Sequence, residues 1–352
     1  MDAKNRAISQ TGSKNREVTP LDTVDIVTQR ISLASANNST SPPLDNETRK
    51  RYEVHDLFRV KSPAFLANYK NPCWKQLSSS RLVCLPYFYL AGFPKCGTTF
   101  TFQTIVGHPE AVKGVDKEPH WITKTRFKSQ TFHPIITGDG SASTAWENPY
   151  WRYLPGNYNC TEPRVLIPHY VYHLNPSSKV IFVVRNPTDR VISSFNYFAI
   201  ENMTAESFHT EIIVEIRTFK DCCSRYSLRV CAYDLGIRVR SGLYHVFIRD
   251  WMKVFPADQI LVVRLEDIRD DLFRAFTRIF DFLSLSQLSR LELQEILNKS
   301  KLNDRTKRFR VKQETRRLLD DFYRPHNTQL ARLLQQHDPS SYLHLHDAMY
   351  SH

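Results

Sequence analysis

Three times along this chain, a short run of apolar residues is followed by a sharp loop and then by a helical pattern. The apolar runs are YFYLAGF at 87–93, KVIFVV at 179–184 and QILVVRLED at 259–267. Continuous apolar strands that alternate with amphipathic helices are typical of a buried parallel sheet with helices on both faces. We therefore predict an α/β fold, a three-layer sandwich around a central parallel sheet.

The rest of the chain divides by composition. Residues 1–50 are rich in Ser, Thr, Asn and Asp and lack a sustained apolar period, which is typical of a flexible segment. We predict a polar stem or tail at 1–54, one catalytic domain at 55–340 and a short tail at 341–352. Within the domain we expect 201–250 to be largely helical and the stretch 316–336 to form two helices divided at Pro325.

Ligands of such sheets bind beyond the carboxyl ends of the strands. Two unusual loops, at Gly92 and at Arg185, follow predicted strands directly. The first carries the two glycines of a Walker A loop at the expected spacing, but Thr98 stands where that motif needs lysine. The lysine, Lys95, lies inside the loop instead.

The Gly92 loop is predicted to hold an anion. Gly92 and Gly97 allow a tight turn, and Thr98 and Thr99 would open a helix whose first N–H groups and dipole attract negative charge. Lys95 adds a mobile positive charge on the leaving-group side of the anion. The alternative is a plain strand-to-helix turn that carries a lysine.

The string GFPKCGTT at 92–99 resembles the 5′-phosphosulfate loop of sulfotransferases that use 3′-phosphoadenosine 5′-phosphosulfate (PAPS). Its Gly-Phe-Pro-Lys form is similar to the Golgi-type carbohydrate enzymes. The resemblance implies a P-loop-like sulfotransferase fold, PAPS as donor, adenosine 3′,5′-bisphosphate (PAP) as product and no metal. It also implies donor contacts from six loop residues, with a catalytic role for the lysine: Gly92, Lys95, Cys96, Gly97, Thr98 and Thr99.

The second loop, in VVRNPTDRVISSFNYF, suits a phosphate because a guanidinium and a hydroxyl can converge on one anion. Arg185 leaves a strand end, and Ser193 follows about two helical turns later. This segment resembles the 3′-phosphate-binding segment of the same enzymes, with Arg185 and Ser193 in the matching positions. An Arg-Asn-Pro turn of purely structural use is the alternative.

Between the two loops, GVDKEPHWITK gathers groups suited to proton transfer. Transfer of a sulfuryl group to a sugar hydroxyl needs a base for the hydroxyl proton, and either Glu118 or His120 could serve, with Glu118 preferred. The segment is similar to the one that supplies the catalytic glutamate in glycosaminoglycan sulfotransferases, and we expect Lys117, His120 and Trp121 to contact the acceptor. A surface turn with satisfied charges is the alternative.

The resemblance extends over about residues 80–336, where several stretches look like the N-acetylgalactosamine 4-sulfate 6-O-sulfotransferase branch. The agreement departs in two places. Related enzymes close the donor site with a Lys-Gly-Arg loop, whereas Leu302 follows Lys301 here, which puts the expected donor contacts of Lys301 and Arg305 in doubt. The family also has an N-terminal membrane anchor, and the N-terminus of this sequence is polar.

The net charge of +12 indicates a polyanionic partner. Residues 1–50 hold seven basic and six acidic residues, so the other 302 carry +11. The resemblance implies a sulfated glycosaminoglycan acceptor, first the 6-OH of N-acetylgalactosamine 4-sulfate in chondroitin or dermatan sulfate. A uronyl 2-O or heparan sulfate position is the alternative. Seven basic residues between 305 and 317 would bind such a chain or simply form a solvated helix face.

Two other function classes are consistent with parts of the pattern. A P-loop kinase or other NTPase would need lysine at position 98 and a carboxylate-held magnesium. A catalytically silent glycosaminoglycan-binding protein would keep the fold and the basic surface. A nucleic-acid partner is not expected, because no recognition helix or RNA-binding signature accompanies the charge.

The cellular compartment is indicated by two features. Six Asn-x-Ser/Thr sites favour a glycoprotein of the Golgi or secretory lumen: Asn37, Asn38, Asn46, Asn159, Asn202 and Asn298. The seven cysteines show no CxxC pair, so no zinc site is expected, and the close trio at 222, 223 and 231 could form one short disulfide or remain as buried thiols. Since no signal peptide and no run of about 18 apolar residues is visible, a soluble or cytosolic form is the alternative.

Overall fold

The structure is a computed structural model, and it describes most of the region predicted to be the catalytic domain. The described residues are 56–76, 80–111, 117–120, 122–123, 138–148, 151–198, 204–299 and 310–337. The predicted boundaries at 54 and 340 lie outside these ranges and remain predictions.

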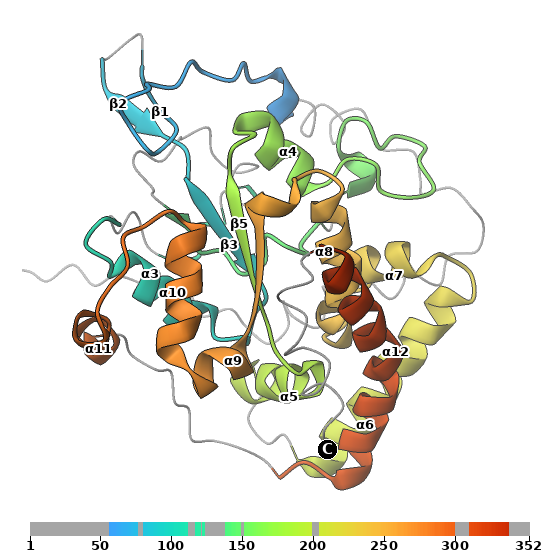
Figure 1. Ribbon diagram of the computed structural model, residues 1–352. Helices are drawn as coiled ribbons and strands as arrows, with labels where there is room; N and C mark the ends of the chain where they lie inside the picture. The colour runs from blue at the N-terminus through green and yellow to red at the C-terminus, as the bar shows by residue number, and fades with distance from the viewer. Residues whose placement is uncertain are drawn as a thin grey trace, which may run out of the picture. The chain divides into compact units, whose positions relative to one another are not determined.

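The core is a parallel sheet of four strands in the order β4-β3-β5-β6 (Figure 1). The strands are β3 (Phe88–Gly92), β4 (Gly138–Asp139), β5 (Lys179–Val184) and β6 (Ile260–Arg264). Three of them are the predicted apolar runs, and their side chains are almost entirely buried. The predicted α/β class is therefore confirmed, and the two-residue strand β4 is an addition that its polar sequence did not reveal.

Helices follow the strands as the alternating pattern predicts. The α-helices are α3 (Thr98–Val106), α4 (Ile167–Leu174), α5 (Pro187–Phe198), α6 (Ala205–Cys223), α7 (Leu228–Asp234), α8 (Tyr244–Met252), α9 (Leu265–Asp270), α10 (Leu272–Phe282), α11 (Arg290–Lys299) and α12 (Gln313–His337). Short 3₁₀ turns are η1 (Leu57–Arg59), η3 (Trp151–Tyr153), η4 (Val239–Gly242) and η5 (Ala257–Gln259). The expectation that 201–250 is largely helical is confirmed by α6, α7 and α8.

Helices cover both faces of the sheet, with α3 and α10 on one side and α8 on the other (Figure 1). Phe102 of α3 packs 6.2 Å from the ring of Phe88 in β3. On the opposite face, Trp251 of α8 meets Phe182 of β5 at 5.8 Å. Since Phe88 pairs with Lys179, and Phe182 lies an odd number of residues beyond Lys179, the two rings point to opposite faces. This is the three-layer arrangement expected from the sequence.

Two disulfides link elements outside the sheet. Cys73 in β1 (Cys73–Lys75) is bonded to Cys84 in β2 (Leu82–Cys84), and these strands form a separate antiparallel hairpin. Cys222 at the end of α6 is bonded to Cys231 in α7, so the close trio forms one bridge and leaves Cys223 as a thiol.

The prediction of two helices divided at Pro325 is wrong, because α12 is one helix with this proline inside it. Proline removes one backbone hydrogen bond and usually breaks or kinks a helix. Here the helix packs along α5, α6 and α8 through buried side chains such as Leu319, Tyr323 and Leu330. This packing offsets the loss. No helix in the described ranges is long and apolar enough to cross a bilayer.

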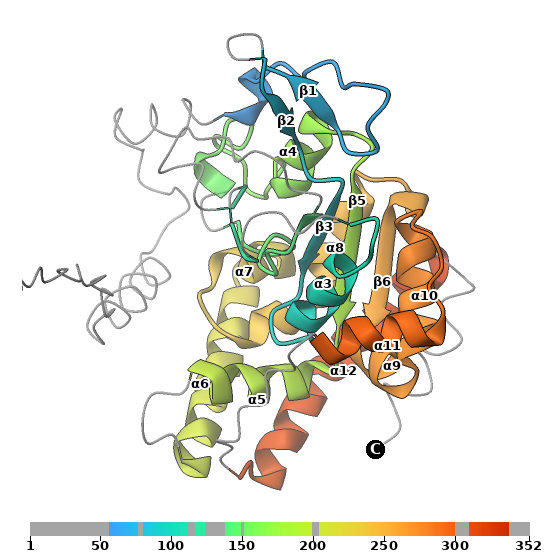
Figure 2. The same cartoon turned by 90° about the vertical axis from the view of Figure 1, so that its left-hand side faces the viewer.

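The carboxyl ends of the strands meet at one edge of the sheet. In Figure 2 this edge is the lower end of the strands, where α5 and α9 begin. Asn186 caps α5 by accepting hydrogen bonds from the N–H groups of Thr188 (3.0 Å) and Asp189 (3.3 Å), and Pro187 occupies the first helical position. Glu266 of α9 accepts from the N–H of Asn186 at 3.0 Å, which joins the ends of β5 and β6.

Candidate active site

The loop between β3 and α3 is fixed at both ends by regular structure. The N–H of Phe93 donates to the carbonyl of Val183 in β5 at 2.9 Å, and the N–H of Thr101 closes the first turn of α3 on the carbonyl of Gly97 at 3.0 Å. The ring of Phe93 is fully buried and packs 4.7 Å from the ring of Tyr244 in α8. The loop therefore lies in a set position at the end of the sheet.

Both glycines of the loop are required by its geometry. A Cβ atom on Gly92 would stand 2.8 Å from the Cβ of Ala145, closer than real Cβ contacts. Gly97 has a φ of +80°, and a Cβ there would meet Leu265 Cδ1 at 2.5 Å. The tight turn expected from the sequence thus has a steric cause at each glycine.

Backbone donors gather where α3 begins. Within the part of the chain that the structure describes, the N–H groups of residues 97–100 have no backbone acceptor. They lie at the positive end of a nine-residue helix, which is an arrangement that binds anions. The N–H of Cys96, in contrast, donates to the carbonyl of Phe93 at 3.2 Å and is already used.

The side chain of Cys96 points into the core rather than toward a ligand. Its sulfur lies 3.5 Å from the hydroxyl of Tyr244, and the residue is fully buried. Burial raises the pKa of this thiol to about 11, with a smaller opposing effect of the Tyr244 contact. The thiol is therefore neutral at physiological pH and serves the packing of the loop.

Lys95 connects the loop to α5. Its backbone has a φ of +67°, and its carbonyl accepts a hydrogen bond from Arg185 Nη1 at 3.3 Å. Its ammonium nitrogen lies 3.4 Å from the centre of the Tyr197 ring. The two predicted anion loops therefore touch each other through Arg185 and Lys95.

Arg185 and Ser193 retain unused hydrogen-bonding capacity. Arg185 Nε is buried and has no hydrogen-bond partner among the described residues. The hydroxyl of Ser193, half-buried on α5, also has no partner there. Since buried polar groups are normally paired, an unpaired guanidinium nitrogen beside an N–H-rich loop fits an anionic ligand.

Glu118 is the centre of a small polar cluster. One carboxylate oxygen contacts the ammonium of Lys117, and the other accepts from the N–H of Ala142 at 3.0 Å. The same second oxygen lies 3.3 Å from Nε2 of His120. Three donors therefore orient this carboxylate.

The contacts of His120 assign its tautomer. Nδ1 lies 3.0 Å from the hydroxyl of Ser143, and Nε2 faces the Glu118 carboxylate, which can only accept. The proton of a neutral ring therefore sits on Nε2, and the Ser143 hydroxyl donates to Nδ1. The N–H of His120 also donates to the Ser141 hydroxyl at 2.9 Å.

The turn at 141–145, directly after β4, brings this cluster to the edge of the sheet. It contacts Glu118 and His120 through Ala142, Ser141 and Ser143. Its last residue, Ala145, donates its N–H to the carbonyl of Ala91 at 2.7 Å, next to the start of the anion loop. The candidate acid–base pair and the anion loop are thus joined by one turn.

Most of the predicted site residues are therefore brought together. The two loops touch directly, and Lys117, Glu118 and His120 are tied to the same edge of the sheet. Trp121, Lys301 and Arg305 lie outside the described residues.

Sequence reasoning missed three residues that shape the site. Tyr197 follows Ser193 by one helical turn, so its i, i+4 spacing was a usable signal. Ser141 and Ser143 carried no signal, because they act only through a contact with a segment about 20 positions earlier in the chain.

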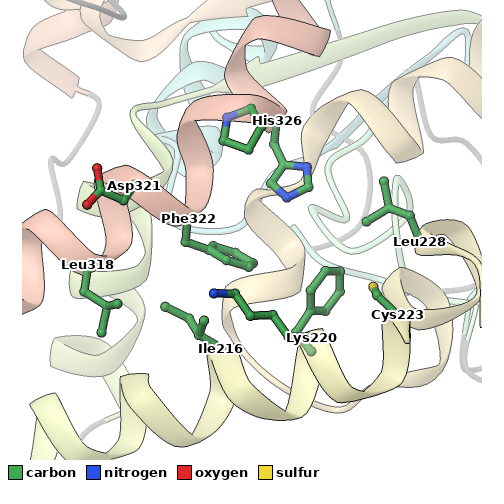
Figure 3. A pocket seen from close by; sticks show the side chains of 10 residues that line it. Ile216, Lys220, Cys223, Leu228, Leu318, Asp321, Phe322 and His326 are labelled. Atoms are coloured by element: carbon green, nitrogen blue, oxygen red, sulfur yellow. The ribbon is translucent and has the colours of Figure 1, made fainter. Parts of the chain in front are cut away.

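A cavity of about 380 Å³ lies elsewhere, between α6 and α12 (Figure 3). Its wall is mainly apolar and includes Ile216, Phe219, Leu318 and Phe322. None of the predicted site residues lines it, so it is separate from the candidate active site.

A family model and several similar proteins both indicate the same family for this chain. Residues 86–329 match the family described as sulfotransferase domain. The chain is 30% identical to carbohydrate sulfotransferase 15 of Rattus norvegicus, over 86% of this chain and 70% of that protein. It is also 30% identical to carbohydrate sulfotransferase 15 of Homo sapiens, over 82% of this chain and 68% of that protein. A sulfotransferase structure from Alicyclobacillus acidocaldarius aligns with a TM-score of 0.47 at 20% identity, covering 74% of this chain and 99% of that one.

Proposed function

The chain belongs to the sulfotransferase family and is homologous to carbohydrate sulfotransferases, and from this we propose that it transfers the sulfuryl group of PAPS to a hydroxyl of a glycosaminoglycan. The observation that carries the proposal is the junction of two anion loops with an oriented carboxylate at one edge of the sheet. PAPS, when bound, supplies a sulfuryl group whose departure leaves PAP.

The residues of the chain fit such a donor. The open N–H groups at 97–100 and the hydroxyls of Thr98 and Thr99 would hold its 5′ end. The guanidinium of Arg185, with its unpaired Nε, and the hydroxyl of Ser193 would hold its 3′-phosphate. Lys95 would stabilise negative charge on the leaving group, which is the kind of preorganised electrostatic help that most lowers such barriers.

Glu118 is the proposed general base. Its carboxylate is oriented by the N–H of Ala142, by Lys117 and by His120, so that it can take the proton of the acceptor hydroxyl. His120 is the alternative base, and its present pairing with Glu118 and Ser143 suits a residue that orients the carboxylate.

The proposed acceptor is chondroitin or dermatan sulfate, at the 6-OH of N-acetylgalactosamine 4-sulfate. The resemblance of the sequence to that branch supports this choice, as does the basic excess of the chain. A uronyl 2-O position or heparan sulfate is the second candidate. Incubation with each acceptor followed by disaccharide analysis of the product separates them, and sulfate found on heparan alone would overturn the first choice.

The Golgi or secretory lumen is the proposed compartment. Two disulfides, Cys73–Cys84 and Cys222–Cys231, suit an oxidising compartment. Asn159 and Asn298 of the glycosylation signals are exposed. A mobility shift on glycosidase treatment that is reduced in Asn159→Gln and Asn298→Gln would support this compartment, and free thiols at all four cysteines in the isolated protein would contradict it.

The reaction is tested by transfer of radiolabelled sulfate from PAPS to chondroitin. Lys95→Ala should lower the rate about 10²–10³-fold, as loss of one electrostatic stabiliser does in other enzymes. Lys75→Ala, which removes the same charge from an exposed position at the end of β1, is the matched control and should have no effect.

Nucleotide specificity separates this function from its rivals. We expect PAP to inhibit transfer, ATP to compete poorly and EDTA to have no effect. ATP hydrolysis that depends on magnesium would instead identify an NTPase. Binding of chondroitin without any transfer would identify a silent glycosaminoglycan-binding protein.

A further inference from the structure

The ammonium group of Lys95 lies against an aromatic ring of α5. Its nitrogen lies 3.4 Å from the centre of the Tyr197 ring, well within the roughly 6 Å over which a cation is attracted to a ring face. Tyr197 belongs to the last turn of α5, whereas Arg185, just before this helix, contacts the backbone of Lys95. The lysine side chain therefore extends along α5 toward its carboxyl end.

This position is close to the proposed 3′-phosphate site. Tyr197 follows Ser193 by four residues, so the two side chains lie on the same face of the helix, one turn apart. Helical side chains lean toward the amino end of their helix, and the Tyr197 ring therefore covers the turn that carries Ser193. The charge of Lys95 therefore lies beside this turn.

The contact is weak enough to be reversed by a ligand. Tyr197 is 41% exposed, and cation–π contacts at exposed sites change an equilibrium constant by about two- to fivefold. A charge-assisted hydrogen bond to a phosphate or sulfate group is stronger than this contact. An anionic donor would therefore draw the ammonium away from the ring.

We propose that Tyr197 is a positioning residue that holds Lys95 beside the donor site in the free enzyme and releases it when the donor binds. The inference rests on the proposed function, because Lys95 is the residue that Tyr197 positions. The ring face makes the contact, so the hydroxyl of Tyr197 is not needed for this role.

The neighbouring residue supplies a matched control. Phe198 is 57% exposed and packs against Tyr197 with ring centres 4.7 Å apart. Adjacent helical residues point about 100° apart, so Phe198 does not share the face that carries Ser193 and Tyr197. Phe198→Leu removes an exposed ring of nearly the same size without removing the proposed contact.

The test is calorimetric measurement of PAP affinity. Tyr197→Leu should bind PAP about two- to fivefold more tightly, because the free enzyme loses a contact that the donor must break. Tyr197→Phe, which keeps the ring face, and Phe198→Leu should bind PAP as the original protein does. In the Lys95→Ala background, Tyr197→Leu should have no effect on affinity.

The outcomes distinguish this inference from the proposed function. If Tyr197→Leu weakens PAP binding or leaves it unchanged, while Lys95→Ala impairs sulfate transfer, Tyr197 is not a resting partner of the lysine and only the inference fails. If Lys95→Ala leaves both PAP binding and transfer unchanged, the role of Lys95 and the inference about Tyr197 fail together. The proposed function itself fails if the original protein neither binds PAP nor transfers sulfate from PAPS.

A second measurement observes the contact directly. In protein labelled with ¹³C at lysine Cε, the Lys95 methylene should resonate upfield because it is bonded to the nitrogen that lies over the Tyr197 ring. Loss of that signal in Lys95→Arg assigns it. The signal should move downfield in Tyr197→Leu and on addition of PAP to the original protein. An upfield signal that persists with saturating PAP would overturn the release step.

Discussion

The two halves of the candidate site are built differently. The donor half, loop 92–99, lies between a buried strand and the start of a helix, and neighbouring atoms leave no room for a side chain at Gly92 or Gly97. The proposed acceptor half, 117–120, contains two non-glycine residues with positive φ, Glu118 at +67° and His120 at +50°, whereas the donor half contains one, Lys95 at +67°. Side-chain contacts with the turn at 141–145 hold this second half.

One half therefore depends on regular structure, and the other depends on a few tertiary hydrogen bonds. Changes in the donor half should therefore affect folding and nucleotide affinity together. Changes in the acceptor half should affect the rate and leave both of the other quantities nearly intact.

The largest expected effect is on the acceptor half. Glu118→Gln should lower turnover about 10²–10⁴-fold, because general-base catalysis typically contributes that much. Affinity for PAP, measured by calorimetry, should stay within about twofold, since the two halves are held separately. Glu295→Gln, an exposed residue of α11, is the matched control. Unchanged turnover in Glu118→Gln would contradict this role and would favour His120 as the base.

The helices that pack against the donor half should become less stable at low pH. His245 of α8 and His326 of α12 form a stacked pair, with Nε2 of the first 3.0 Å from Nδ1 of the second. Burial lowers the pKa of His245 to about 3, with a smaller effect of His326, and lowers the pKa of His326 to about 4. His245 adjoins Tyr244, which packs on the anion loop.

The sign follows from these shifts. Below pH 6.5, the histidines of the unfolded chain take up protons that the folded pair does not bind. The stability that the neutral pair contributes is therefore present above pH 6.5 and is lost as the pH falls below it. Between pH 7.5 and 5.5 the free energy of unfolding should drop by about 3 kcal/mol for the two residues together. Urea titrations at both pH values measure it, and His326→Phe should show a smaller drop. An equal drop in the variant would contradict the assignment.

Asp139, which lies outside both halves, should change stability with pH in the opposite direction. Burial raises the pKa of Asp139, which ends β4 just before the 141–145 turn, and its contact with Ser141 opposes this effect. The folded protein then binds the proton of Asp139 more tightly than the unfolded chain, in which the pKa is near 3.8. The free energy of unfolding should therefore fall as the pH rises from 3.8 through the raised pKa of the folded state. Asp139→Asn should remove this contribution while leaving the histidine effect unchanged.

A backbone change in the donor half is the next test. Gly97→Ala should lower the free energy of unfolding by about 1–3 kcal/mol, because it adds a Cβ at positive φ and presses on Leu265. PAP affinity should fall with it. Adding Leu265→Ala should relieve only the steric part, so the double variant should be less affected than the sum of the two single changes. Strict additivity would contradict the contact.

The smallest expected effect belongs to Ser143. Ser143→Ala removes the hydroxyl that donates to His120 Nδ1, and one such hydrogen bond is worth about 1 kcal/mol. The value of kcat should fall about fivefold, with the KM for PAPS unchanged and the acidic limb of the pH profile shifted. Ser224→Ala, on the exposed end of α6, is the matched control. A loss of stability without the pH shift would make Ser143 structural only.

The same contrast explains how much could be predicted from the sequence. The strands β3, β5 and β6 are recognisable in the sequence as apolar runs. The loops between strands and helices are marked by Gly92, Gly97 and the Asn186-Pro187 cap. These signals are local, so the parallel sheet and the place of the β3–α3 loop could be predicted, whereas anion binding by that loop stays a prediction. The membership of the sulfotransferase family, expected from the loop motifs, was also confirmed.

The parts that escaped prediction depend on contacts between distant segments. β4 has only two polar or small residues and becomes a strand because β3 lies beside it. Pro325 is accommodated within α12 because neighbouring helices pack along it. The pairing of Ser143 with His120 and of Lys95 with Tyr197 joins residues far apart in the chain. The spacing of Tyr197 from Ser193 marks a shared helix face, but it does not encode the contact with Lys95.

The central claim is that the β3–α3 loop and the start of α5 together hold the nucleotide donor. The most direct measurement is a crystal structure of the protein with PAP. The 5′-phosphate of PAP should lie against the N–H groups of residues 97–100, and its 3′-phosphate should lie between Arg185 and Ser193. PAP bound in the cavity between α6 and α12, with the loop empty, would contradict it.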